Sequence, residues 1–285
     1  MSPSVSKTSP GAKRAEFRRL HESGCFVIPN PWDVGSARYL QHLDFKALAT
    51  TSSGAAWVLG LADNGVGLEG MLAHLRELAD ASDIPLNADF EHGYADDAAG
   101  VAANVAKAVE TGIAGLSIED STGRADKPLY DLALAIERIK AARQAIDRSN
   151  SGVLLTARAE CFLVGHPDPL NESIKRLQAY AAAGADCLYA PGLRNRDQIA
   201  AIVKAVAPKP VNLLVGAAGL TVSEIAGLGV RRISTGGALA RAAWTGFMNT
   251  AKEIASTGSF AGFASIVPFG EIDGFFGADA KKRKA

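Results

Sequence analysis

The chain repeats one pattern of polar and apolar positions: an amphipathic segment of helical length, then a glycine, then a short apolar run. Residues 110–118, 182–190 and 227–235 share this order. A glycine commonly follows a helix C-terminus, and an apolar run of about four to eight residues is typical of a buried strand. The pattern predicts eight strands, at residues 25–29, 45–49, 84–86, 113–118, 152–156, 185–189, 210–215 and 230–234.

Helical segments are predicted before, between and after these strands, at residues 12–24, 34–43, 70–81, 98–110, 133–147, 171–183, 197–206, 222–228 and 238–256. Short apolar strands that alternate with helices favour an α/β fold of the (β/α)8 barrel type, because crossover helices cover parallel strands. A doubly wound open sheet is the alternative. Such a sheet usually has about five or six strands and a glycine-rich loop after the first strand, where this chain has Asn30-Pro31-Trp32-Asp33 instead.

The predicted barrel occupies residues 13–257 and leaves three further segments. Residues 1–12 are rich in Ser, Pro and Lys, which predicts a disordered arm. Residues 258–276 carry many apolar side chains, and we expect this segment to form extra C-terminal helical structure that packs on another subunit. Residues 277–285 are predicted to be a flexible basic tail.

Composition indicates a small-molecule ligand. Lysine and arginine total 30 residues, and aspartate and glutamate also total 30, so no net charge would attract nucleic acid or an anionic membrane. The apolar runs are far shorter than the roughly 20 residues that span a bilayer. A polar N-terminus without a secretory signal, together with three cysteines that cannot all pair, predicts a cytoplasmic protein.

Carboxylates, amides and one arginine follow the predicted strands, and the residues from Leu86 to Tyr94 show this most clearly. In a (β/α)8 barrel the active site lies at the C-terminal ends of the strands. Oxygen ligands from carboxylates and amides suit a hard cation such as Mg²⁺, and an arginine opposite it can bind a substrate carboxylate through two hydrogen bonds. The strand-end candidates are Asp33, Ser53, Gly54, Asn87, Asp89, Glu91, Glu119, Asp120, Arg158, Asn212 and Gly236.

Several other chemistries lack the residues that they need. No lysine lies at a strand end, which argues against a Schiff-base aldolase. The chain has no histidine pair at metal-binding spacing and no Gly-x-Ser-x-Gly motif, which argues against zinc hydrolysis and a serine triad. A weaker alternative is a sugar-phosphate site, with a phosphate held by Gly216, Gly219, Gly236 and Gly237.

Five motifs in order resemble the isocitrate lyase and phosphoenolpyruvate mutase superfamily over about residues 15–250. They are Asn-Pro-Trp-Asp-Val-Gly-Ser-Ala-Arg (30–38), Thr-Thr-Ser-Ser-Gly (50–54), Ala-Asp-Phe-Glu-His-Gly-Tyr (88–94), Ser-Ile-Glu-Asp (117–120) and Thr-Ala-Arg (156–158). The resemblance implies an eight-stranded barrel, Mg²⁺ with Mn²⁺ as a substitute, an α-keto or α-hydroxy carboxylate as substrate, and an enolate-type intermediate. It also implies homotetramers that exchange a C-terminal helix.

The resemblance also implies roles for individual residues. It assigns the substrate's carboxylate and carbonyl oxygens to Ser53 and Gly54, substrate binding to Arg158, and the catalytic roles to Ser53, Gly54, Arg158 and Glu119. Asn212, in the predicted seventh strand, is a further substrate-binding candidate because of its position. The implied metal residues are Asp63, Asn87, Asp89, Glu91 and Glu119. In this set Asn87 replaces the Asp that the superfamily usually has, so Glu91 is a candidate substitute. The loop after the fourth strand, residues 121–129, lacks the superfamily's Lys-Lys/Arg-Cys-Gly-His sequence.

The sequence therefore favours a Mg²⁺-dependent lyase that cleaves a carbon–carbon bond of a small 2-oxo or 2-hydroxy di- or tricarboxylate. Reactions of the 2-methylisocitrate lyase and oxaloacetate decarboxylase type both fit. One alternative is a phosphonomutase or phosphonopyruvate hydrolase on the same scaffold. The other is a barrel without catalytic activity that only binds a carboxylate.

Overall fold

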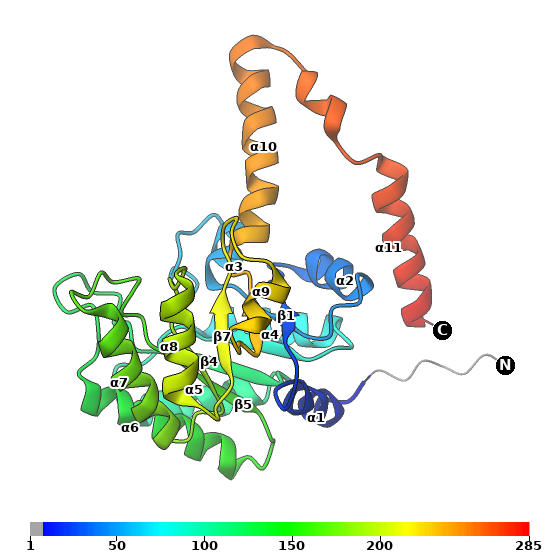
Figure 1. The fold of residues 1–285 in the computed structure, drawn as a ribbon. Helices are drawn as coiled ribbons and strands as arrows, with labels where there is room; N and C mark the ends of the chain where they lie inside the picture. The colour runs from blue at the N-terminus through cyan, green and yellow to red at the C-terminus, as the bar shows by residue number, and fades with distance from the viewer. Residues whose placement is uncertain (1–7, 285) are drawn as a thin grey trace.

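The computed structural model describes residues 8–284 and contains one eight-stranded parallel sheet surrounded by helices (Figure 1). The strands follow the order β1-β8-β7-β6-β5-β4-β3-β2. The amide of Ala49, the last residue of β2, donates a hydrogen bond to the carbonyl of Pro29 just after β1 at 3.0 Å, which joins the two ends of the sheet. The strands are β1 (Phe26–Ile28), β2 (Leu48–Ala49), β3 (Leu86–Asp89), β4 (Gly115–Glu119), β5 (Leu154–Arg158), β6 (Cys187–Tyr189), β7 (Val211–Leu214) and β8 (Arg232–Ser234).

The predicted (β/α)8 barrel is confirmed, and helices connect and cover its strands. These are α1 (Pro10–Leu20), α2 (Val34–His42), α3 (Ser52–Val58), α4 (Leu68–Ala81), α5 (Ala98–Val109), α6 (Leu132–Arg148), α7 (Pro169–Ala182), α8 (Arg196–Val206) and α9 (Val222–Gly227). Two helices follow the barrel, α10 (Ala238–Thr257) and α11 (Phe269–Lys284), with the short 3₁₀ helix η1 (Ala261–Ser265) between them. None of the helices in residues 8–284 has the length and apolarity that a membrane span requires.

The N-terminal helix closes the bottom of the barrel. Ser9 caps α1 by accepting a hydrogen bond from the Ala12 amide, so the helix starts inside the arm predicted at residues 1–12. The first seven residues of that arm lie outside the described residues. Phe17 on α1 is fully buried and packs with the small apolar cluster inside the barrel, which also contains Ile28 and Leu154. This apolar plug leaves only the C-terminal ends of the strands for a site.

Two local predictions differ from the structure near that end. Strand β3 continues to Asp89, whereas the apolar pattern ended it at Leu86. The apolar criterion failed because Asn87 and Asp89 line a cavity inside the barrel, so polar residues occupy inward positions of the strand. Residues 52–58, for which no helix was predicted, form α3, whose Thr51 cap accepts a hydrogen bond from the Gly54 amide.

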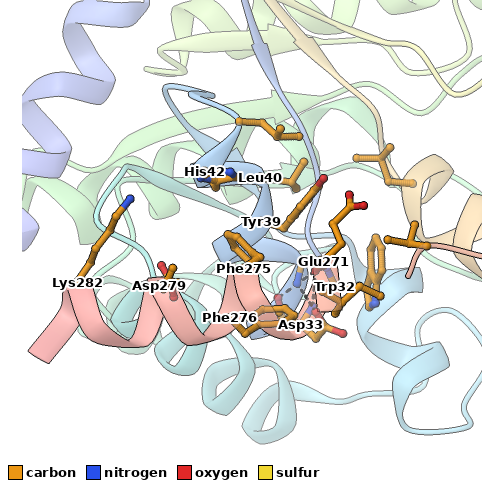
Figure 2. Close-up of a pocket in the computed structure, with 17 residues that line it drawn as sticks. Trp32, Asp33, Tyr39, Leu40, His42, Glu271, Phe275, Phe276, Asp279 and Lys282 are labelled. Carbon is orange, nitrogen blue, oxygen red and sulfur yellow. Dashed lines mark hydrogen bonds between the residues drawn. The ribbon is translucent and has the colours of Figure 1, made fainter. Parts of the chain in front are cut away.

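The C-terminal segment corrects the prediction of a flexible tail at residues 277–285. Helix α11 extends to Lys284, because Asp279 within it forms a buried ion pair with Arg38 of α2 at 2.5 Å. Figure 1 shows α10 projecting away from the barrel and α11 returning toward α2. Figure 2 shows Phe275 of α11 beside Tyr39 of α2, where the rings meet edge to face at 5.2 Å between centroids. A cavity of about 870 Å³ lies along this contact.

Candidate active site

A second cavity, of about 200 Å³, lies inside the barrel at the C-terminal ends of the strands. Eight of the residues proposed from the sequence line it, and they come from β3, β5, β7, α3, the loop before α4 and the segment after β8. These eight are Ser53, Asp63, Asn87, Asp89, Arg158, Asn212, Gly236 and Gly237. Parallel strands bring their C-terminal ends together at one edge of a sheet, which explains how residues far apart in sequence converge here.

Arg158 at the end of β5 is the centre of this site. Its Nη1 lies 2.7 Å from Oδ1 of Asp89, its Nη2 3.1 Å from Oε2 of Glu119, and its Nε 2.9 Å from Oε1 of Glu160. Glu119 pairs with Arg158 in the β4–β5 register, so both side chains leave neighbouring strands at the same height. The Arg158 guanidinium thus forms ion pairs with three carboxylates that come from the end of β3, the end of β4 and the segment after β5.

Burial shapes the charge of this cluster. Burial lowers the pKa of Arg158, but Glu119, Glu160 and Asp89 outweigh that effect and raise the pKa well above its usual range. Burial raises the pKa of Glu119 well above its ordinary value, and the charge of Arg158 only partly opposes this. Burial raises the pKa of Glu160 in the same way. One buried cation therefore stabilises several buried carboxylates, which would be costly to ionise without it.

Backbone and side-chain hydrogen bonds fix two of these carboxylates. Asp89 accepts a bond from the Ser52 amide at 3.1 Å through Oδ2, and its own amide donates to Thr50 Oγ1 at 2.8 Å. The amide of Glu160 donates to Oδ1 of Asp120 at 2.8 Å. The other oxygen of Asp120 accepts bonds from Tyr180 at 2.6 Å and Arg176 at 3.0 Å. The acids are therefore held in place before any ligand binds.

The Ser53-Gly54 segment lies beside the cavity, but its two residues differ in position. Ser53 lines the cavity, and its Oγ lies 3.1 Å from Oγ1 of Thr51. Gly54 is buried behind it, where a Cβ would lie 2.6 Å from Thr51 Cγ2 and 2.8 Å from Trp32 Cβ. Gly237 gives Ser53 its space, because a Cβ there would lie 2.8 Å from Ser53 Oγ. Glycine at these two positions lets the chain segments approach closely.

The residues proposed for metal binding supply oxygen ligands on one side of the cavity. Asn87 is 4% exposed, and its buried Oδ1 has no hydrogen-bond partner. Asp89 lies two residues further along β3, and Asp63 is an exposed residue of the same cavity lining. Within residues 8–284, no three His, Cys, Asp or Glu side chains come close enough together to hold a metal by themselves. An unpaired amide oxygen in the same cavity lining as two carboxylates nevertheless fits a hard cation that keeps several waters.

Glu91 and Glu119 lie behind the cavity lining. Glu91 is 3% exposed and accepts a hydrogen bond from the Tyr94 hydroxyl at 2.8 Å. Burial raises the pKa of Glu91 to about 7. Both Glu91 and Tyr94 have left-handed backbone conformations, with φ of 46° and 55°, which is uncommon for residues other than glycine. The sharp turn after β3 therefore places a carboxyl group in a buried position that the apolar pattern did not predict.

The sequence interpretation missed two residues of this region. Glu160 was passed over although it lies two residues beyond Arg158, the spacing that returns a side chain to the same side of an extended segment. Arg232 lines the cavity from β8. The sequence does carry a sign of this role: a charged residue inside a predicted apolar strand, two positions before Ser234, so that both side chains lie on the same side of β8. Of the glycines proposed as a phosphate cradle, Gly236 and Gly237 line the cavity, whereas Gly216 and Gly219 do not.

The profile of the phosphoenolpyruvate phosphomutase family matches residues 17–255. The chain belongs to this family. A solved structure of a lyase/mutase from Burkholderia cenocepacia J2315 shares 44% sequence identity and a TM-score of 0.89, over 94% of this chain and 96% of that one. An oxaloacetate decarboxylase from Paraburkholderia xenovorans is 30% identical over 79% of this chain and 75% of its own length. The 2-methylisocitrate lyase of Escherichia coli K12 is 32% identical, over 65% of this chain and 63% of its own length.

These relatives confirm the superfamily that the five motifs indicated. They also confirm the prediction of an enzyme of the isocitrate lyase and phosphoenolpyruvate mutase type. The family match spans all eight strands, from the end of α1 to the end of α10. It therefore includes every element that contributes a side chain to the cavity.

Proposed function

We propose that this protein is a metal-dependent lyase that cleaves a carbon–carbon bond of a small 2-oxo or 2-hydroxy carboxylate with more than one carboxyl group. The observation that carries the proposal is the position of Arg158, a buried cation at the mouth of the cavity beside Ser53 and Asn212. Nη1 and Nη2 each carry two N–H groups, so after pairing with Asp89 and Glu119 each keeps one that can bind a substrate carboxylate and hold the substrate in one orientation. The named relatives that catalyse lyase and decarboxylase reactions support this assignment.

Oxaloacetate illustrates the bond changes. The bond between C3 and C4 breaks, and its electron pair moves to C3 and onto the 2-oxo oxygen as the enolate of pyruvate. C4 leaves as carbon dioxide, and a proton then returns to C3. Arg158 orients the carboxylate next to the 2-oxo group, and the Ser53 hydroxyl can donate to the oxygen on which negative charge develops. The closed bottom of the barrel keeps bulk water away from that side of the substrate.

A divalent cation would be held by oxygen atoms of Asp89, Asn87 and Asp63, with Glu119 and Glu91 near them. We propose Mg²⁺, with Mn²⁺ as a substitute, because both prefer oxygen ligands. When bound, the cation would polarise the 2-oxo oxygen of the substrate. Asn87 contributes a neutral ligand where a carboxylate would add charge, so we expect weaker metal affinity than an Asp at this position would give.

Release of pyruvate from a panel of four compounds tests the function. The panel contains oxaloacetate, 2-methylisocitrate, dimethylmalate and phosphonopyruvate, each assayed with Mg²⁺ and with a chelator. We expect Mg²⁺-dependent release from one of the three carbon–carbon substrates and its loss in Asp89→Ala. Release from phosphonopyruvate alone would replace the proposal with phosphorus–carbon hydrolysis. Silence on all four, with folded protein and added metal, would contradict the cleavage of these substrates to pyruvate and favour a different substrate or a barrel that only binds carboxylates.

We also propose that copies of this chain assemble through α10 and the segment after it, in a homotetramer that exchanges α11. Only Ala240 is buried among the 20 residues of α10. The exposed large apolar side chains on these elements include Trp244, Phe247, Met248, Phe260, Phe263, Ile266 and Phe269. An apolar surface of this kind is typical of a protein–protein interface.

Light scattering coupled to size-exclusion chromatography tests the assembly. We expect a mass of about four times 29.6 kDa for the unchanged chain. Phe247→Glu should lower the mass, because a buried, unpaired carboxylate disfavours an apolar interface. Val222→Glu is a matched control, since Val222 is an exposed apolar residue on α9, and it should leave the mass unchanged. A monomeric unchanged chain would contradict the proposal.

A further inference from the structure

Arg232 lies across the interior of the barrel below the cavity that Arg158 lines. It is the first residue of β8 and is 3% exposed. Its Nε donates to Oδ1 of Asn212 on β7 at 2.8 Å, and its Nη2 donates to Oγ1 of Thr156 on β5 at 3.1 Å. Reaching from β8 to β5 takes the side chain across the barrel, so its guanidinium forms part of the floor of the cavity.

This guanidinium has only neutral partners. Besides Asn212 and Thr156, its Nη1 lies 3.3 Å from Nε2 of His21. Burial, and then the charge of Arg232, lowers the pKa of His21 to about 3, so this ring is neutral. No carboxylate in residues 8–284 forms an ion pair with Arg232. A guanidinium has five N–H groups, and two of them make none of these bonds.

A buried charge without a counter-ion is costly, which makes Arg232 unusual in the core of a barrel. The other buried cation of the same cavity, Arg158, has three carboxylates around it. Since Asp89 pairs with Arg158 and Asp63 lies at the exposed rim, the deep part of the cavity wall keeps one uncompensated positive charge. That charge would be offset by an anionic group entering the cavity.

An anion can reach Arg232 only from the mouth. On the opposite side, the rings of Phe17, His21 and Phe26 pack edge to face. Their centroids are 4.7 Å apart for Phe17 and His21, 5.1 Å for His21 and Phe26, and 6.5 Å for Phe17 and Phe26, and Phe17 is fully buried. Ser117 and Ser234 also line the cavity, together with the apolar residues Ile28 and Leu214. The cavity that Arg158 and Arg232 share is therefore partly polar, and the aromatic rings close it on the side away from the strand ends.

We propose that Arg232 forms a second anion subsite, which binds one carboxylate of a short dicarboxylate while Arg158 binds the other. The role of this subsite in substrate specificity rests on the lyase function proposed above. Binding of an anion at the subsite can be tested without turnover. The subsite assigns the substrate class to dianions that span the cavity from mouth to floor. Monocarboxylates of the same length would leave the charge of Arg232 uncompensated.

Binding of succinate and of butyrate, measured by isothermal titration calorimetry in the presence of a chelator, tests the subsite. The two probes have the same number of carbon atoms and differ in the second carboxylate. We expect the unchanged protein to bind succinate at least about tenfold more tightly than butyrate, as a charge-assisted hydrogen bond predicts. Arg232→Met should abolish that preference without weakening butyrate binding.

Two further variants keep the test decisive. Asn212→Asp places a carboxylate 2.8 Å from Nε of Arg232 with almost no change in shape, so it should also abolish the preference even if Arg232→Met folds poorly. Arg231→Met is the matched control, because Arg231 is the neighbouring arginine and contacts the Gly24 carbonyl at the surface. This control should bind succinate as the unchanged protein does. A structural role for Arg232 would instead predict a lower unfolding midpoint in Arg232→Met with the preference retained.

Equal binding of succinate and butyrate by the unchanged protein, or an unchanged preference in Arg232→Met and Asn212→Asp, would overturn the subsite. Its failure can be told apart from failure of the lyase proposal. Pyruvate release with the same KM in Arg232→Met would remove the subsite and leave the lyase. A silent substrate panel together with an Arg232-dependent succinate preference would remove the lyase proposal and leave the subsite.

Discussion

Replacing Arg158 with Met should destabilise the fold by about 3–5 kcal/mol at pH 8 and reduce any turnover by roughly 10²–10³-fold. The substitution leaves Asp89, Glu119 and Glu160 buried without their shared cation. Burial already raises the pKa of Glu119 and Glu160, and removal of the positive charge raises them further. The free energy of unfolding, measured by urea denaturation, and the pyruvate-release rate check the two parts of this expectation.

The dependence of this loss on pH has a definite sign. Carboxyl groups whose pKa is raised in the folded state bind more protons there than in the unfolded chain, so they lower stability as the pH rises through the raised values. The loss in Arg158→Met should therefore be smaller at pH 5 than at pH 8. Arg143→Met is a suitable control, because Arg143 pairs with Asp147 and Asp186 on the outside of the barrel and should not affect turnover. An equal loss at both pH values would show that the three acids do not depend on Arg158.

The fold could be predicted from the sequence because the same local signals recur along the chain. Glycines that end helices, as at Gly112 and Gly184, have positive φ angles in the structure and directly precede buried strands. What was missed lacks this pattern. Helix α3 begins with two serines and a glycine. Extra C-terminal helical structure was predicted for residues 258–276, but not its continuation to Lys284, where Asp279 of α11 pairs with Arg38 across 241 positions. Contacts over such separations leave no periodic signal.

The site could be predicted only as far as strand ends determine it. Strand ends brought Asp89, Arg158 and Asn212 to one cavity, because the strands are parallel. The direction and reach of long side chains were not predictable in this way. Arg232 crosses the barrel to Thr156, and Arg158 reaches Glu160, because of register and packing that one sequence does not display. The local pattern therefore brought out the candidate residues that share a cavity, whereas their charge pairing follows only from the three-dimensional structure.

Replacing Glu91 with Gln should make the protein more stable above pH 7 and should have little effect near pH 4. Burial raises the pKa of Glu91 from its ordinary value of 4.5 to about 7, so the folded state binds the extra proton between these values and stability falls as the pH rises. At about 1.4 kcal/mol for each pH unit, the full penalty is roughly 3 kcal/mol. Urea denaturation from pH 4 to pH 9, with a chelator present, should show a gain of that size that develops between pH 4.5 and pH 7.

Further variants separate the effect of the Glu91 charge on stability from the effect of the shape of its side chain. In Glu91→Gln the side-chain amide oxygen would still accept the hydrogen bond that Tyr94 donates at 2.8 Å, so packing is retained. Tyr94→Phe removes that donor, whose hydrogen bond lowers the pKa of Glu91, and should therefore make the loss of stability with rising pH larger. Glu69→Gln, at an exposed position of α4, should change stability by less than about 0.5 kcal/mol throughout. A gain in Glu91→Gln that is the same at pH 4 and pH 9 would show that the buried charge is not its cause.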